Sequence, residues 1–92
     1  MTPAVIDARS VPPLERFPLI FSTFDSLVPG QAFELINNHD PLPLYFKFRD
    51  VRKGLFDWQY VVAGPAQWRV RIARTAGQNP DAADASTAGA MN

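Results

Sequence analysis

The sequence predicts an α+β fold, a two-layer sandwich in which two helices cover one face of a four-stranded mixed sheet. Two segments carry apolar residues at helical spacing, and each follows a short strand-like segment. Two further segments alternate apolar and polar residues across a Gly-Pro turn, which is typical of a hairpin. Because such strands and helices each have one apolar face, they bury it best in two stacked layers. The predicted order is β-α-β-α-β-β.

The first predicted strand spans residues 4–8, and Pro12-Pro13 open a helical region after it. Proline has no backbone N–H to donate, so Pro18 fits best in a first helical turn. The regular helix is therefore expected over 17–28, with Pro29-Gly30 ending it. The apolar residues expected on its buried face follow helical spacing: Phe17, Ile20, Phe21, Phe24, Leu27 and Val28.

The second strand is predicted over 31–37, with Phe33 and Leu35 on one face. The second helix is expected over 41–53, where Asp40 provides the N-cap and Pro41 suits the first helical position. Its expected buried stripe consists of Leu44, Phe48 and Val51, and Gly54 ends it.

The last two strands form the predicted hairpin, over 56–62 and 68–72. Three large aromatic residues are expected on its core face: Trp58, Tyr60 and Trp68. The opposite face carries polar residues that cross-strand pairing explains: Glu34, Asp57, Gln59, Arg69 and Arg71. If that face is uncovered, Ile36 and Val61 are candidates for a protein contact.

Composition excludes whole classes of chemistry. The chain has no cysteine, which rules out disulfides, thiolate metal sites and thiol nucleophiles. A single histidine without cysteine predicts no dedicated metal site and no cofactor. No apolar run is long enough to span a bilayer and no signal peptide precedes the first strand, so a cytoplasmic protein is expected.

Residues 1–75 are expected to form one domain, followed by a disordered tail over 76–92 that lacks large apolar residues except one methionine. The expected domain has nine Lys and Arg and seven Asp and Glu, a balance of +2. So small an excess argues against nucleic-acid binding. Nothing in the sequence bears on the oligomeric state.

Several motifs together resemble a known family. Residues 4–74 are similar to domain-of-unknown-function family 2249, and more widely to the TusA/SirA sulfur carriers, which share the β-α-β-α-β-β order. The similarity is carried by Asp7-Ala8-Arg9, Pro12-Pro13-Leu14-Glu15-Arg16, Pro18-Leu19-Ile20-Phe21, Phe24-Asp25, Pro29-Gly30, His39-Asp40-Pro41, Pro43-Leu44-Tyr45, Trp58, Gly64-Pro65 and Trp68-Arg69-Val70.

The sulfur carriers have a Cys-Pro-x-Pro motif at the start of the first helix. The helix dipole at that end favours the thiolate form of the cysteine. In the corresponding place this chain has Pro13. The resemblance therefore implies the scaffold without persulfide transfer. It also implies a setting in redox, metal-centre or nitrogen-oxide metabolism.

Polar side chains follow the two parallel strands of the predicted sheet. Because the carboxyl ends of parallel strands share one edge, they are expected near two helix N-termini that favour an anion. The candidate binding residues are Asp7, Arg9, Glu15, Arg16, His39, Asp40 and Tyr45. Structural interpretations compete with binding: Asp40 as a helix cap, His39 as a polar lid over the helix start, and Asp7 with Arg9 as a simple ion pair.

Two functions remain open. The first is a non-catalytic binding or adaptor module that meets a protein partner or small anion at this edge. The alternative is a small enzyme in which His39 is a general acid or base and Arg9 or Arg16 holds an anionic substrate.

Overall fold

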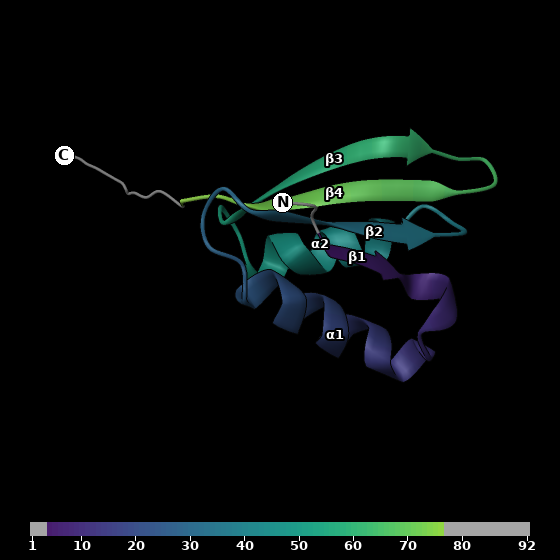
Figure 1. Cartoon of the computed structure of the whole chain (residues 1–92), viewed down its shortest axis with the longest axis horizontal. Helices are drawn as coiled ribbons and strands as arrows, with labels where there is room; N and C mark the ends of the chain where they lie inside the picture. Colours follow the sequence, from purple (N-terminus) through teal and green to yellow (C-terminus); the bar gives the residue numbers. More distant parts are fainter. Residues whose placement is uncertain (1–3, 77–92) are drawn as a thin grey trace, which may run out of the picture.

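A computed structural model describes residues 4–76 and confirms the α+β sandwich (Figure 1). Both helices lie on one face of a four-stranded sheet. The elements in chain order are β1 (Ala4–Asp7), a 3-10 turn η1 (Ala8–Ser10), α1 (Pro13–Asp25), β2 (Ala32–Asn37), α2 (Leu42–Val51), β3 (Phe56–Ala63) and β4 (Trp68–Arg74). Of the predicted tail, 76–92, all but the first residue lies outside the described range.

The strand order in the sheet is β1-β2-β4-β3. β1 runs parallel to β2, whereas β4 is antiparallel to both β2 and β3. The register places Leu35 of β2 between Ile6 of β1 and Val70 of β4, and Val70 beside Tyr60 of β3. The hairpin thus inserts its second strand into the centre of the sheet and leaves β3 at an edge.

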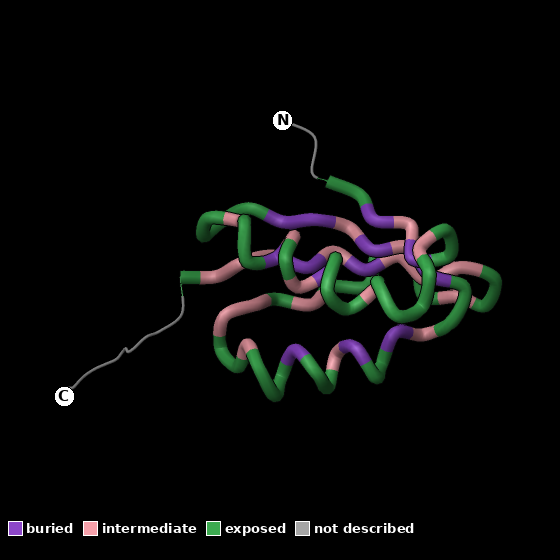
Figure 2. The backbone as a smooth tube through the Cα atoms, turned by 90° about the horizontal axis from the view of Figure 1, so that it is seen from below, coloured by how far each residue is buried: buried purple, intermediate pink, exposed green. Residues whose placement is uncertain are grey.

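The core lies between the sheet and the two helices, where the inward faces of both layers are buried (Figure 2). Phe48 of α2 is fully buried at its centre, and its ring centroid is 4.5 Å from that of Phe21 and 5.2 Å from that of Phe24. The strand side of the core has Phe56 at 5.2 Å and Trp58 at 6.1 Å from the same ring. One side chain therefore contacts α1, β3 and the rest of the core at once.

α1 begins and ends earlier than predicted. It starts at Pro13 and ends at Asp25, so Pro18 lies inside the helix and not in its first turn. Pro13 at the first helical position needs no backbone N–H, because an N–H there would have no partner within the helix. Pro18 lacks the N–H that would have donated to the carbonyl of Leu14, so α1 loses one hydrogen bond. Leu14 is 93% exposed, so water can bond that carbonyl. Val28, which was expected in the buried face, lies beyond the helix and is exposed.

α2 is also shorter than predicted. Its N-cap is Pro41, which has no side-chain hydrogen bond, so the expectation that Asp40 caps the helix is wrong. The helix ends at Val51, which is 42% exposed and does not belong to the buried stripe. Leu44 and Phe48 are buried as expected.

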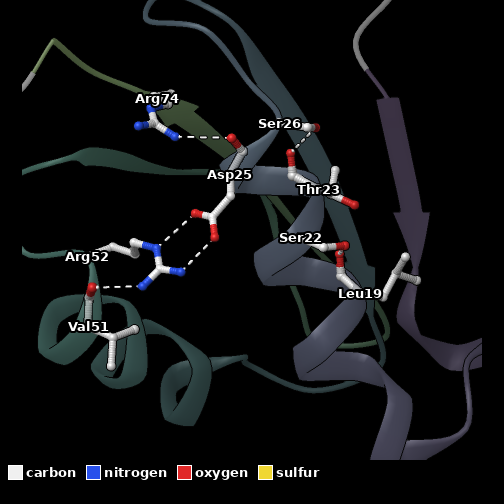
Figure 3. A network of polar contacts seen from close by, with 8 residues as sticks. All are labelled: Leu19, Ser22, Thr23, Asp25, Ser26, Val51, Arg52 and Arg74. Atoms are coloured by element: carbon white, nitrogen blue, oxygen red, sulfur yellow. Dashed lines mark hydrogen bonds and ion pairs between the residues drawn. The ribbon is translucent and has the colours of Figure 1, made fainter.

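The C-terminal ends of the two helices are joined by a bidentate ion pair (Figure 3). Arg52 donates from Nε and Nη2 to the two carboxylate oxygens of Asp25 at 2.9 and 2.7 Å. These hydrogen bonds, which outweigh the opposing effect of partial burial, lower the pKa of Asp25. Arg74 of β4 donates to the Asp25 carbonyl at 3.4 Å, so the sheet joins the same contact.

The β3–β4 hairpin forms as predicted, with an irregularity in register between Tyr60 and Val62. Gly64 in its turn has a φ of +67°, and the Gly64–Pro65 peptide is cis. The expectation that all three hairpin aromatics are core is only partly correct. Trp58 packs against the core, but Tyr60 is 39% exposed and Trp68 is half-buried over the turn.

The other face of the sheet carries Glu34 and Arg69, which form an ion pair across β2 and β4. Val61 is exposed, whereas Ile36 is half-buried. Within residues 4–76, no helix has the length and apolar character needed to cross a membrane.

Candidate functional site

The carboxyl ends of β1 and β2 lie together, because the two strands pair in parallel from Ala4 opposite Phe33 to Asp7 opposite Ile36. The predicted site residues that follow these strands do not form one cluster. They separate into an ion pair, a pocket and an aromatic group.

Asp7 and Arg9 form the ion pair. The Arg9 side chain donates from Nε and Nη2 to the two carboxylate oxygens at 2.8 and 2.7 Å, and its backbone N–H donates to Asp7 Oδ1 at 3.1 Å. The hydrogen bonds from the guanidinium hold the pKa of Asp7 below its usual value. Both side chains remain partly exposed. Their charges neutralise each other, so the ion pair explains both residues without a role in binding.

A small pocket of about 90 Å³ lies between the starts of α1 and α2 and the end of β2. Apolar residues make up most of its lining, and three polar residues complete it: Arg16, Asn37 and His39. The apolar lining residues are Ala8, Phe17, Ile20, Leu35, Pro41, Pro43 and Leu44. The structure therefore brings together two of the predicted site residues, Arg16 and His39.

Arg16 is held in place by its own backbone neighbourhood. Its Nε donates to the carbonyl of Val11 at 2.8 Å, and the side chain is half-buried. Among residues 4–76, neither Nη atom has a hydrogen-bond partner within the usual distance. The guanidinium is thus oriented at the pocket wall with its two terminal nitrogens available to an acceptor.

Asn37 was not among the predicted site residues. It is the one buried polar residue of the described chain, and its Oδ1 accepts the backbone N–H of Asn38 at 2.8 Å. That contact leaves the side-chain amide N–H groups for the pocket. The signal was present in the sequence, because Asn37 continues the inward alternation of Phe33 and Leu35 in the second strand.

His39 lies at the exposed side of the same pocket. Its Nδ1 is 2.9 Å from Oδ1 of Asn38. Since an amide oxygen only accepts, Nδ1 carries the proton in this contact and Nε2 is left for solvent or a ligand. The partner is a neutral amide and not the carboxylate that often strengthens a histidine as a base.

Asp40 points to a different neighbour. Its Oδ1 accepts the hydroxyl of Tyr60 at 2.6 Å, which joins the start of α2 to the edge strand β3. Burial raises the pKa of Tyr60, and the hydrogen bond to Asp40 raises it further, whereas the Trp58 indole acts in the opposite direction. The indole N–H of Trp58 is itself buried and has no hydrogen-bond partner among the described residues.

The remaining two predicted residues do not line the pocket. Tyr45 packs into an aromatic group, with its ring 5.2 Å from that of Trp58 and 6.1 Å from that of Phe56. Arg49 lies over the Tyr45 ring at 6.0 Å. Glu15 is exposed in the first turn of α1, where a carboxylate favours the helix dipole.

The size and lining of the pocket limit what it can bind. Sites for drug-sized molecules have roughly 300–1,000 Å³, so about 90 Å³ admits one small group. Its polar lining consists of a guanidinium, an amide and an imidazole, with no carboxylate. These groups match a small anion or the acceptor group of a larger partner. No group of three side chains able to hold a metal ion occurs within residues 4–76.

Comparison with protein families gives one result. The family described as "Uncharacterized conserved protein (DUF2249)" matches residues 5–74, which includes every described helix and all but the first residue of the described strands. Neither a curated protein nor a solved structure matches the chain.

Proposed function

The chain belongs to the DUF2249 family, and from this premise we propose that it is a non-catalytic binding or adaptor domain whose contact site is the pocket between the two helix starts. A protein partner or a small anion meets Arg16 and His39 there. The observation that carries the proposal is the lining itself. Arg16 and Asn37 bring hydrogen-bond donors to a largely apolar lining, and no acidic residue is among the residues that line the pocket.

The size of the pocket supports binding over catalysis. An enzyme must hold both a substrate and the group that reacts with it, whereas about 90 Å³ holds one small group. His39 has the neutral amide of Asn38 as its partner. The alternative of a small enzyme with His39 as general acid or base therefore has less support than the binding domain.

We further propose that the scaffold is of the TusA/SirA type, with Pro13 in the place of the sulfur-carrying cysteine. The shared element order and the helix that starts at Pro13 support this assignment. On this view the domain keeps the docking edge of a sulfur carrier without its chemistry. It acts in redox, metal-centre or nitrogen-oxide metabolism, in a cytoplasmic setting.

Binding at the pocket is tested by comparing partner recovery among three single variants. Charge reversal in Arg16→Glu places a carboxylate against the bound acceptor, so we expect recovery to fall at least tenfold, the loss of roughly one charge-assisted hydrogen bond. His39→Ala is expected to weaken recovery less. The measurement is a quantitative pulldown with the purified domain as bait.

Lys53→Glu is the matched control, because it makes the same charge reversal on an exposed residue beyond the C-terminal end of α2. Equal recovery by the wild type and all three variants would contradict the pocket as the contact site.

The inherited helix start is tested by restoring a thiol. In Pro13→Cys, the new side chain lies at the first position of α1, where the helix dipole stabilises a thiolate. We expect its pKa to fall below the free-cysteine value of about 8.5. The pH dependence of alkylation measures it, and no other cysteine in the chain interferes.

Ser22→Cys on the exposed side of α1 is the control, with an ordinary thiol pKa expected. A Pro13→Cys thiol that titrates with the control would count against a thiolate-stabilising helix start.

A further inference from the structure

Exposed apolar residues adjoin, along the chain, the residues that line the pocket. Phe17 lines the pocket and is 40% exposed, and Leu14, one helical turn before it, is 93% exposed. On α2, Leu42 is 44% exposed between two prolines that both line the pocket. Single exposed apolar residues are common, but three beside one pocket indicate a surface for a protein.

A free anion would make no use of these apolar residues, Leu14, Phe17 and Leu42, which we call the rim. An ion of that kind is bound by Arg16 and Asn37 alone and leaves the rim in water. Burying the rim requires an apolar surface on the partner. The occupant therefore carries apolar groups as well as an acceptor.

The floor of the pocket fits an aliphatic group. Ile20, Leu35 and Leu44 are each at most 4% exposed and form the floor. The pocket volume of about 90 Å³ is smaller than the cavity of ~150 Å³ that takes benzene. A short aliphatic side chain therefore fits it better than an aromatic ring.

The free donors of Arg16 select the acceptor group of the partner. The Arg16 Nη atoms have no hydrogen-bond partner among the described residues, and Arg9 neutralises the charge of Asp7. Asp40 accepts the Tyr60 hydroxyl but keeps its charge, and Glu15 is exposed on the same turn as Arg16, so both oppose an acid and the attraction comes from direct contact with the guanidinium. A carboxylate next to an aliphatic side chain matches the Arg16 donors and the apolar floor.

We infer that the pocket and its rim receive an acidic, apolar peptide segment of a partner protein. One aliphatic side chain enters the pocket, and a neighbouring carboxylate accepts hydrogen bonds from the Arg16 Nη atoms. The inference rests on the proposed binding function and specifies the chemistry of its partner.

The test is titration of the ¹⁵N-labelled domain with four probes, followed by NMR chemical shifts of the amides of Arg16, His39 and Leu44. The probes are acetyl-Gly-Leu-Glu-Gly amide, its Leu-Gln and Leu-Lys counterparts, and sodium acetate. We expect saturable shifts with the Leu-Glu peptide and binding at least about tenfold weaker for the other three, the difference made by one charge-assisted contact.

Variants separate the two parts of the contact. Arg16→Gln is expected to remove the preference for Leu-Glu over Leu-Gln, and Leu14→Ser to weaken both peptides alike. Leu19→Ser is the control, since Leu19 is also an exposed leucine of α1 but does not belong to the rim. Glu15→Gln is expected to strengthen Leu-Glu binding, because it removes a negative charge on the same helical turn as Arg16.

The outcomes distinguish this inference from the function on which it rests. Acetate binding as tightly as the Leu-Glu peptide would overturn the peptide segment but retain an anion-binding pocket. Equal binding of Leu-Gln or tighter binding of Leu-Lys would overturn the acidic partner. The Arg16→Gln variant could still show amide chemical-shift changes and still bind the Leu-Glu peptide more tightly than the Leu-Gln peptide. That result would place the contact elsewhere and would contradict the proposed function as well.

Discussion

Among individual side chains, Asp40 shows how a polar residue changes its partner when the chain folds. An aspartate before Pro41 is a reasonable N-cap by local rules, yet its carboxylate accepts the Tyr60 hydroxyl at 2.6 Å. Tyr60 lies on the edge strand β3, next to the irregularity in register between Tyr60 and Val62. Neither feature is visible in the residues around Asp40.

Removal of this hydroxyl should be measurable. Tyr60→Phe is expected to lower the free energy of unfolding by about 1 kcal/mol at pH 7, the usual net value of a hydrogen bond that is partly exposed. Urea unfolding measures it. Tyr45→Phe is the control, because the Tyr45 hydroxyl has no hydrogen-bond partner among the described residues. Equal losses in the two variants would show that the Asp40 contact adds no stability.

The same contact predicts a pH dependence. The pKa of Tyr60 is raised above 10.0 in the folded state, chiefly by burial, so folding favours the neutral phenol. The resulting stability is present below the unfolded pKa and is lost as the pH rises through the folded pKa. The difference between wild type and Tyr60→Phe should therefore shrink in alkali. In Tyr45→Phe, where Tyr60 is the remaining tyrosine, tyrosinate absorbance should show a midpoint above 10.0.

Among the helices and strands, the hairpin turn depends on one glycine. Gly64 has a φ of +67°, and a Cβ on it would lie 2.7 Å from Cε2 of Trp68. Gly54 after α2 has a similar φ of +75°, but a Cβ there would meet nothing within 4 Å. The two positions share the backbone conformation and differ in the ring beside them.

Gly64→Ala is thus expected to cost more than Gly54→Ala. Both variants carry the left-handed penalty of about 1–2 kcal/mol, and only Gly64→Ala must also displace the Trp68 ring. Urea unfolding of the two proteins gives the difference, and the near-UV circular dichroism of tryptophan should change only in Gly64→Ala. Identical unfolding curves would mean that the ring moves at no cost.

For the domain as a unit, stability depends on the aromatic packing around Phe48. This ring contacts residues from α1 and β3 and closes the core of a chain with few residues to spare. Domains of this kind are stable by roughly 5–15 kcal/mol. A single large loss at Phe48 is therefore expected to affect every element.

Phe48→Ala should remove about 3–5 kcal/mol, the usual range for a buried phenylalanine. We expect the midpoint of thermal unfolding to fall by more than about 10 °C, since 1 kcal/mol shifts it by roughly 4–8 °C in a domain of this size. Phe46→Ala on the same helix is the control, because Phe46 is more than half exposed and its loss should stay near 0.5 kcal/mol. A Phe48→Ala protein as stable as this control would contradict the core assignment.

Residue patterns along the chain were enough to predict the fold class, the hairpin, the buried face of β2 and two buried residues of α2, Leu44 and Phe48, but not the exposure of Val51. The correct predictions follow from periodicity and from proline and glycine, which act over a few neighbouring residues. The predicted helix ends were less accurate. The start of α1 was predicted too late because Pro18 was expected in the first turn, whereas α1 accommodates Pro18 in its interior beside the exposed Leu14.

Which polar side chains meet depends on the fold as a whole. Local pattern placed Arg16 and His39 at helix starts, but their meeting with Asn37 in one pocket depends on the parallel pairing of β1 with β2 and the packing of both helices beside it. Likewise, Asp40 meets Tyr60 of β3, which lies at the sheet edge because β4 occupies the centre. Periodicity fixes the direction of a side chain, whereas its partner depends on contacts between residues far apart in the chain.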